Sequence, residues 1–364
     1  MRILMTADAS GGVGVLADEL ARALLARGHQ VLITVFSPTQ PEFSPGLHRL
    51  WAPFRLEWMD CNSEAAVAAD ARAGRAFLAD LARHWRPDVL HSNQFAYVGV
   101  VPGIPTLLGV HSDVISWWRS VRGSAPPGNA YQRWYAVNAR QALEGAAAVV
   151  APSQAARDDL RRSYGWRHPV RVIVNGRDAS LFRCEHKQPF ALAVGRWWDE
   201  GKGLTLLQGL REHGGLEVAV AGELRHPLRP SPCAPLAGLR VLGQLPPAAL
   251  RDWMARALIY VGTSRYEPFG LAVLEAALSG CALALHDIPS WRELWGPVAW
   301  FFRTRAELRA LLRRAAAEPA WAWERGEAAC RYARRRFTAA RMAQAYEAVY
   351  RQIEAPEPKP ALRR

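Results

Sequence analysis

The chain has 364 residues, of which 50% are hydrophobic and 22% are charged, so its composition supports a large core and excludes a generally disordered protein. This length predicts two domains or one large domain. The formal net charge is +13, and most of the excess lies in an arginine-rich stretch from Arg303 to Arg351. Such a surface either attracts nucleic acid, anionic lipid or a phosphorylated substrate, or is a solvated helical face.

The lengths of the apolar runs and the positions of the cysteines further restrict the class of protein. No apolar run reaches the ~18–20 residues that span a bilayer, and the apolar stretch after Met1 is too short for a signal-peptide core. The five cysteines are far apart and form no CxxC pair, which argues against a disulfide framework and a zinc site. We therefore expect a cytoplasmic protein.

The first half of the chain alternates short apolar runs with helical patterns. We expect strands at 2–7, 30–36, 88–91, 106–111, 147–151 and 170–174. A helix that ends at Gly28 follows the first strand, and further helices are expected near 64–84, 130–144 and 153–163. This alternation predicts a parallel sheet with helices on both faces.

A second alternation follows the polar stretch 184–189. Strands are expected at 190–194, 216–221, 240–242, 258–261, 281–285 and 298–301, with helices near 203–212, 247–256, 270–279 and 304–316. The tail 321–353 is predicted to be helical, and 356–360 to be frayed. The sequence therefore predicts two doubly wound α/β domains, 1–183 and 190–335, which face each other across a cleft and bind ligands at the carboxyl ends of their strands.

A glycine-rich turn, Ser10-Gly11-Gly12-Val13-Gly14, follows the first strand. Its GxGxxA spacing suits a dinucleotide fold, in which the pyrophosphate lies on helix amides. That fold also needs an acidic residue at the end of the second strand, and the chain has Phe36-Ser37-Pro38 there. The turn is better interpreted as a loop that lets a phosphate or a sugar approach the backbone.

A stronger constellation lies in the second half. Arg196 ends a strand and Lys202 opens the next helical segment, so both cations can reach one diphosphate. Only three of the 46 basic residues are lysines, which draws attention to Lys202. Two solvated surface cations are the alternative.

Two glutamates follow a later strand. Glu267 precedes a helix whose amides near Phe269, Gly270 and Leu271 can hold an anion. Glu275 lies within that helix among apolar neighbours, so its carboxylate should have a polar partner. The alternatives are an acid that stabilises the helix N-terminus and an exposed helix acid.

The segment from Glu267 to Glu275 resembles the E-x7-E signature of retaining GT-B glycosyltransferases, in particular glycosyltransferase family 4. The stretch from Gly195 to Gly203 resembles the diphosphate-binding segment of that family. The turn at Ser10-Gly11-Gly12 and the segments 151–153 and 172–176 match in order, and the resemblance runs from residue 1 to about 350.

The resemblance implies two Rossmann-like domains, the first for the acceptor and the second for a nucleotide-sugar donor, with a helix at 338–353 that crosses back to the first. It implies that Arg196 and Lys202 bind the diphosphate, that Glu275 holds the ribose and that Glu267 contacts the donor sugar. Further donor contacts are implied at Gly11, Gly12, Phe269, Gly270 and Leu271.

The resemblance also places His111 near the reacting centre. A core or capping histidine is the alternative for His111, and the same holds for His91, which stands in a segment that departs from the family pattern. Gly222-Glu223 departs from that pattern too. Catalytic contacts are thus expected from His111, Glu267, Arg196 and Lys202.

The acceptor is expected near Trp117, Trp118 and Arg119, in a loop between His111 and Asn129. Aromatic faces beside a cation suit a sugar or a phosphorylated lipid, and core packing is the alternative for the tryptophans. A carbohydrate and a lipid-linked acceptor both remain open, the latter with peripheral contact to the cytoplasmic membrane.

We therefore expect a retaining glycosyltransferase that uses a UDP- or GDP-linked sugar. The absence of a D-x-D triplet fits catalysis without a metal ion. A nucleotide-sugar epimerase on the same scaffold is the alternative. A nucleic-acid partner is not expected, because the chain has no aromatic–basic RNA motif and no helix-turn-helix pattern.

Overall fold

The computed structural model describes residues 1–9, 11–43, 45–58, 64–210, 216–226 and 236–354. Its contacts divide the chain into two compact units. The first unit holds Met1–Ser116, Ala125–Gly176 and the segment from Ala339 onward, and the second holds Trp117–Ser124 and Arg177–Thr338. The chain therefore leaves the first unit and later returns to it.

The first unit contains, over the described residues, a sheet of seven parallel strands in the order β3-β2-β1-β4-β5-β6-β7. The strands are β1 (Arg2–Asp8), β2 (Gln30–Phe36), β3 (His48–Ala52), β4 (Val89–Ser92), β5 (Thr106–Gly109), β6 (Ala148–Ala151) and β7 (Arg171–Val172). Its helices are α1 (Gly12–Leu25), α2 (Glu64–Trp85), α4 (Ala130–Gly145), α5 (Gln154–Tyr164) and α11 (Ala339–Glu354), with a 3-10 turn η1 at Phe95–Tyr97. The central strands are buried, β4 throughout and β1 from Ile3 to Asp8, because helices cover the sheet.

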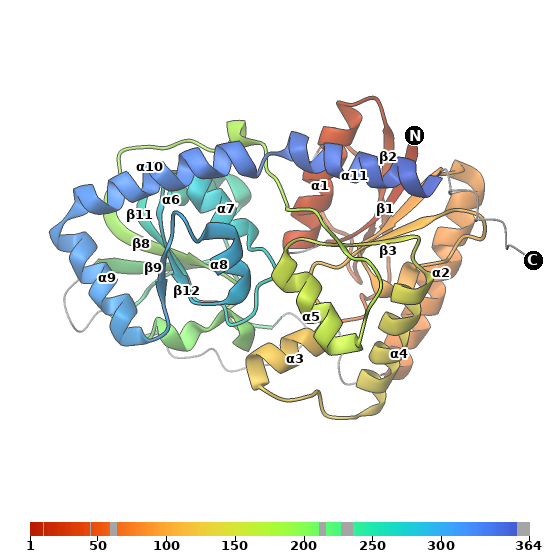
Figure 1. The fold of residues 1–364 in the computed structure, drawn as a ribbon, viewed down its shortest axis with the longest axis horizontal. Helices are drawn as coiled ribbons and strands as arrows, with labels where there is room; N and C mark the ends of the chain where they lie inside the picture. Colours follow the sequence, from red (N-terminus) through yellow and green to blue (C-terminus); the bar gives the residue numbers. More distant parts are fainter. Residues whose placement is uncertain (10, 44, 59–63, 211–215, 227–235, 355–364) are drawn as a thin grey trace, which may run out of the picture. The chain divides into compact units, whose positions relative to one another are not determined.

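Helix α11 lies beside α1 in the first unit (Figure 1). The Arg27 Nε atom donates to Glu347 Oε2 at 2.7 Å, and this hydrogen bond lowers the pKa of the buried Glu347 carboxyl. The Tyr350 hydroxyl lies 2.7 Å from Nδ1 of His91 on the central strand β4, and both side chains are buried. The last helix is therefore an integral part of the first unit.

The second unit has a six-stranded parallel sheet, over the described residues, in the order β10-β9-β8-β11-β12-β13. The strands are β8 (Gln188–Val194), β9 (Glu217–Ala221), β10 (Arg240–Gly243), β11 (Ala257–Gly262), β12 (Ala282–His286) and β13 (Trp300–Phe302). Its helices are α6 (Pro247–Arg256), α7 (Leu271–Leu278), α8 (Pro289–Trp295), α9 (Arg305–Ala317) and α10 (Pro319–Arg336). The sequence pattern predicted that strands and helices alternate in both halves of the chain, and the two parallel sheets with their helices confirm this prediction.

Several local predictions were wrong. The predicted loop after His111 contains helix α3 (Val114–Arg122), which the Gly- and Pro-rich residues on its C-terminal side conceal. Asp113 Oδ1 accepts the Ser116 N–H at 2.8 Å and so caps the first turn. Strand β3 and helix α8 were not predicted, because β3 is half exposed and α8 has only seven residues.

Two predicted helices also differ. Within the described residues, 203–212 forms a short 3-10 turn η4 (Leu204–Leu206) instead of a helix, and 211–215 lie outside them. The tail is two helices, because the Phe337 carbonyl accepts the Arg177 N–H at 3.1 Å and so departs from helical bonding. The stretch 356–360 lies outside the described residues, among which no helix is long and apolar enough to cross a membrane.

Candidate active site

The strand order of the second sheet reverses between β8 and β11. On one side the chain winds from β8 to β9 and β10, and on the other from β11 to β12 and β13. In doubly wound sheets the loops that leave two such strands separate, and ligands bind at the carboxyl ends beside this switch point. The residues after Val194 and after Gly262 therefore form the candidate site of this unit.

The two loops are held against each other by backbone contacts. The Arg265 N–H donates to the Gly201 carbonyl at 2.8 Å, and Thr263 Oγ1 donates to the Lys202 carbonyl at 2.7 Å. Gly203 has φ 66°, and a Cβ atom at this position would lie 2.2 Å from the Thr263 carbonyl oxygen. Only glycine fits here, so the sequence Lys202-Gly203 fixes the approach of the loops.

Lys202 and Glu267, which sequence analysis predicted separately, are brought together. Lys202 Nζ lies 2.6 Å from Glu267 Oε2, and the two side chains are 20% and 21% exposed. Ser290 Oγ donates to the Glu267 carbonyl at 2.5 Å and so fixes the backbone that carries the carboxylate. The ion pair is accessible to a ligand, yet it is shielded enough for its charges to act strongly.

Arg196 lies on the same loop as Lys202. Its guanidinium is 3.7 Å from Asp199 Oδ2 and 5.3 Å from the centre of the Trp198 ring. The side chain is 36% exposed, whereas the neighbouring Trp197 is buried and donates to the Ala221 carbonyl. Trp197 is therefore a core residue, and the partly exposed Arg196 is a second cation of this loop, beside Lys202, that can turn toward an anion.

Helix α7 starts beside this pair. Its N-cap Gly270 has φ 90°, and no side chain caps the first turn. Phe269 is buried, and its carbonyl accepts the Trp291 indole N–H at 3.2 Å. Leu271 is the first helical residue. The amides of this turn can therefore bind an anion, while the Phe269 side chain belongs to the core.

Glu275 forms an ion pair with Arg177, at 3.1 Å between Oε1 and Nη2. The two side chains are 15% and 10% exposed. The prediction that this carboxylate needs a polar partner is confirmed, but the partner was missed. Arg177 directly follows the segment 172–176, which sequence analysis matched to a family motif without assigning a role to the arginine. Arg177 and Glu275 are far apart in the sequence, so no local pattern indicates that they pair.

Asp199 was also missed by sequence analysis. It caps the 3-10 turn η3 (Glu200–Lys202) by accepting the Gly201 N–H at 2.9 Å, and its carbonyl accepts the Lys202 N–H. The same Oδ1 atom accepts the Trp117 indole N–H at 3.1 Å. The signal that could have identified it is an acidic residue two positions before a glycine, which is a common turn cap.

The predicted acceptor residues lie on α3. Trp117 and Trp118 are half-buried, and their rings meet edge to face at 5.8 Å. Trp117 contacts the loop that carries Lys202, whereas Arg122 lies over the Trp118 ring at 5.2 Å. Arg119 is exposed. Trp118 and Arg119 thus keep accessible surface, and Trp117 is engaged by Asp199.

In the first unit, the glycine turn follows β1. Gly11 is the N-cap of α1 with φ 85°, and Gly12 is its first residue; both are exposed. A Cβ atom on Gly14 would lie 2.4 Å from the Asp8 carbonyl oxygen. Gly14 therefore allows α1 to pack against the strand end, while Gly11 and Gly12 leave backbone open to a ligand.

His111 lies after β5. Its Nε2 donates to Asn93 Oδ1 at 2.9 Å, because the Asn93 amide donates to the Thr6 carbonyl at 2.6 Å. Desolvation lowers its pKa from 6.5 to about 4, so the ring is neutral at neutral pH. His91 is fully buried, and desolvation lowers its pKa to about 3. Its Nδ1 atom forms a hydrogen bond with the Tyr350 hydroxyl. His91 is therefore a core histidine.

The chain matches two family models. The model described as Glycosyltransferase Family 4 matches residues 10–181, and the one described as Glycosyl transferases group 1 matches residues 188–314. Glycogen synthase of Mycobacterium tuberculosis is 27% identical, in an alignment that covers 99% of this chain and 97% of that protein. These matches favour glycosyl transfer over the epimerase alternative.

Solved structures share the fold. Sucrose-phosphate synthase from Thermosynechococcus elongatus has a TM-score of 0.80 at 18% identity, covering 97% of this chain and 99% of that one. Anabaena HepE in complex with UDP and glucose has a TM-score of 0.70 at 17% identity, covering 97% and 100%. WaaG, a glycosyltransferase involved in lipopolysaccharide biosynthesis, has a TM-score of 0.71 at 13% identity, covering 96% and 99%. These structures show that the chain has the GT-B fold, and the two family models together with the mycobacterial relative support a glycosyltransferase of the family 4 type.

Proposed function

We propose that this glycosyltransferase moves a sugar from a UDP- or GDP-linked donor to a hydroxyl of a carbohydrate or lipid-linked acceptor, with retention of anomeric configuration and without a metal ion. The observation that carries the proposal is the Lys202–Glu267 pair at the switch point of the second sheet, 2.6 Å apart and one-fifth exposed. The solved complexes of HepE with UDP and with UDP-glucose support a nucleotide-sugar donor.

The leaving group explains the need for cations. As the bond between the sugar C1 and the diphosphate oxygen breaks, negative charge grows on the diphosphate, and a positioned cation lowers the barrier. Lys202 supplies a compact charge, Arg196 a planar fork, and the uncapped turn of α7 its free amides. Glu267 orients Lys202 and contacts the donor sugar, while Glu275, held by Arg177, binds the ribose hydroxyls.

Retention follows if the acceptor attacks from the face that the diphosphate leaves. The acceptor oxygen then bonds to C1 as the C1–diphosphate bond breaks, and the acceptor proton passes to the departing diphosphate oxygen. No enzyme nucleophile takes part. Neutral His111 presents Nδ1, a buried atom with no hydrogen-bond partner among the described residues, as an acceptor for a sugar hydroxyl.

The acceptor contacts proposed on α3 are Trp118 and Arg119. An indole face beside a cation suits either a glycan or a phosphorylated lipid, and a lipid acceptor would entail peripheral membrane contact. The mycobacterial relative named glycogen synthase favours the glycan. Glycogen and maltoheptaose are therefore the first acceptors to test.

The test incubates the purified chain with UDP- and GDP-sugars and these acceptors, and follows nucleoside diphosphate release and the anomeric ¹H signal of the product. We expect acceptor-dependent release, a product of unchanged configuration and full activity in EDTA. Lys202→Met should slow release by ~10²–10³-fold, as expected for the loss of one transition-state contact, whereas Arg240→Met, which removes an exposed cation from the edge strand β10, should leave it unchanged. An inverted product or a loss of activity in EDTA that Mg²⁺ restores would refute the mechanism.

A further inference from the structure

Trp198 stands between Arg196 and Lys202 in the sequence, and its side chain reaches a third loop at the same edge of the sheet. The Trp198 indole N–H donates to Glu223 Oε2 at 3.1 Å. Glu223 follows β9, and its carbonyl accepts the Trp197 N–H at 2.7 Å. The loop after β9 therefore holds both the backbone of the loop after β8 and the Trp198 side chain.

These two loops meet at a glycine. Gly222 has φ 117°, and a Cβ atom at this position would lie 2.1 Å from the Gly195 carbonyl oxygen. Only glycine allows this approach, so the backbone places Glu223 beside the Trp198 indole.

Two further side chains contact the Trp198 ring, which is half-buried. The Arg196 guanidinium lies 5.3 Å from the ring centre. The His226 ring meets the indole edge to face, with centroids 4.4 Å apart and planes 62° apart. Because these neighbours already contact the ring and Glu223 binds its N–H, we interpret Trp198 as a support inside the protein and not as a stacking surface for a sugar.

An aromatic support suits the task of Arg196. A guanidinium binds a diphosphate through pairs of N–H groups and through its positive charge. A carboxylate at hydrogen-bond distance would occupy N–H groups and offset the charge, whereas an aromatic ring attracts the cation without accepting a hydrogen bond in its plane. Asp199 Oδ2 lies 3.7 Å from Arg196 Nη2, which is longer than a hydrogen bond. Trp198 can therefore restrain Arg196 and leave its charge to a ligand.

We propose that Trp198 is a positioning residue for the donor diphosphate, which holds Arg196 beside Lys202 and is itself held by Glu223. The Lys202 stem passes over Gly195, because a Cβ atom on that glycine would lie 3.6 Å from Lys202 Cγ. The two cations therefore belong to one cluster. This inference rests on the proposed function, in which Arg196 binds the diphosphate. In this role Trp198 acts on donor affinity only through Arg196.

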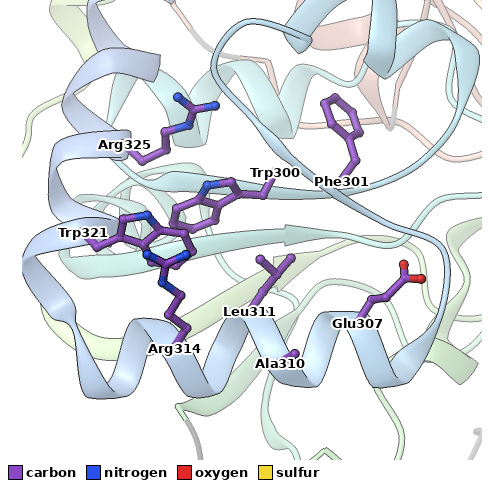
Figure 2. Close-up of a pocket in the computed structure, with 8 residues that line it drawn as sticks. All are labelled: Trp300, Phe301, Glu307, Ala310, Leu311, Arg314, Trp321 and Arg325. Atoms are coloured by element: carbon purple, nitrogen blue, oxygen red, sulfur yellow. The ribbon is translucent and has the colours of Figure 1, made fainter.

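A similar contact between an arginine and an indole lies at the β13 edge of the second unit. Arg314 lies 4.0 Å from the centre of the Trp321 ring, which stacks on Trp300 with centroids 3.9 Å apart (Figure 2). These side chains line a cavity of about 690 Å³, and no described residue of the candidate site lines it. Trp300 and Arg314 already cover the Trp321 ring, so we assign no ligand to this cavity. Trp321→Leu is the matched control, because it removes a half-buried indole and its arginine contact away from the donor site.

The test measures dissociation constants by calorimetry, without acceptor, for UDP and GDP and for the nucleosides uridine and guanosine. The variants are Trp198→Leu, Arg196→Ala and the two combined. Glu223→Leu and Glu223→Gln reach the same ring from its partner. Both remove the carboxylate charge, but only glutamine can still accept the indole N–H, so this comparison tests the support even if Trp198→Leu fails to fold.

We expect Trp198→Leu to raise the dissociation constant of the nucleoside diphosphate ~3–10-fold, the scale of one cation–π contact, and that of the nucleoside less than twofold. In the Arg196→Ala background the same substitution should change neither constant by more than twofold, because its effect passes through Arg196. Glu223→Leu should weaken diphosphate binding, whereas Glu223→Gln and Trp321→Leu should stay within twofold of wild type.

The inference is overturned if Trp198→Leu binds the diphosphate like wild type, or if the two single effects multiply in the double variant. It is also overturned if nucleoside binding weakens as much as diphosphate binding, if the two Glu223 variants behave alike, or if Trp321→Leu weakens binding as much as Trp198→Leu. A wild-type chain that binds neither UDP nor GDP would refute the proposed donor and this inference with it. A wild-type chain that binds one of them, with any of the other outcomes, would refute only this inference.

Discussion

Replacing Arg177 with alanine should strongly destabilise the second unit. Arg177 Nη2 lies 3.1 Å from Glu275 Oε1, and the side chains are only 10% and 15% exposed. Removing the cation leaves a carboxylate enclosed by the apolar residues of α7 without its counter-charge. The cost is then set by the stranded charge rather than by the lost attraction.

The magnitude follows from this burial. Breaking a fully buried ion pair by removing one partner costs ~3–5 kcal/mol. The remaining exposure lets water reach the carboxylate, so we expect about 2–4 kcal/mol in the free energy of unfolding. For a unit of this size, 1 kcal/mol corresponds to a change in Tm of ~2–4 °C, which gives a fall of roughly 4–16 °C.

Urea and thermal unfolding of Arg177→Ala, Glu275→Gln and the double variant measure this cost. Glu275→Gln should be milder, and combining it with Arg177→Ala should recover part of the loss, because the stranded charge is gone. Arg183→Ala is the control; it removes an arginine of the same segment that is 67% exposed and pairs with Glu185 and Asp252, and should change the free energy of unfolding by less than ~1 kcal/mol. The reasoning is refuted if Arg177→Ala lowers the free energy of unfolding no more than Arg183→Ala does, and if the effects of Arg177→Ala and Glu275→Gln simply add in the double variant.

Other predictions concern the loops and the first unit. Lys202→Met should slow transfer by ~10²–10³-fold in steady-state assays with little change in Tm, as expected for loss of one transition-state contact, and a slowing below threefold would remove Lys202 from catalysis. Gly203→Ala should lower the free energy of unfolding by more than ~1–2 kcal/mol in urea titrations, because φ is 66° and the Thr263 carbonyl oxygen occupies the place of a Cβ atom. A variant as stable as wild type would show that the loops after β8 and β11 are not in contact. Trp117→Phe should weaken nucleoside diphosphate binding in calorimetry more than Trp118→Phe does, since only Trp117 donates to Asp199; equal effects would contradict this role. His111 has a pKa of about 4 when folded against an ordinary 6.5, so the unfolded chain gains a proton first, and stability should be full above pH 6.5 and fall toward pH 4. His111→Asn should remove only the part of this fall that His111 contributes, because His91, with a pKa of about 3, contributes to it as well; an unchanged fall would show that His111 titrates normally.

Periodicity predicted most of the sheets because buried parallel strands are short apolar runs between helical patterns. It failed where the signal is weak. Strand β3 alternates exposed and half-buried residues at a sheet edge, and α3 is capped by Asp113 but followed by Gly123 and a proline-rich stretch. The predicted helix after Lys202 is replaced by 3-10 turns, because Gly203 must adopt a positive φ to let the two loops meet.

The candidate site was predictable in its residue types and only partly in its contacts. Lys202 and Glu267 are 65 positions apart, and their meeting follows from the neighbouring positions of β8 and β11. Arg177 and Asp199 were missed, since the partner of a buried carboxylate and the cap of a turn depend on tertiary placement. Local sequence patterns therefore identify a buried charged side chain that needs a polar partner, whereas the partner itself is known only from the fold.

The central claim is that Lys202, Arg196 and Glu275 form the donor site, and a crystal structure of the chain with a bound nucleoside diphosphate tests it most directly. The account predicts phosphate oxygens within hydrogen-bond distance of Lys202 Nζ, the Arg196 guanidinium and the first amides of α7, with the ribose hydroxyls on the Glu275 carboxylate. A nucleotide bound elsewhere, with the Lys202–Glu267 pair untouched, would contradict it.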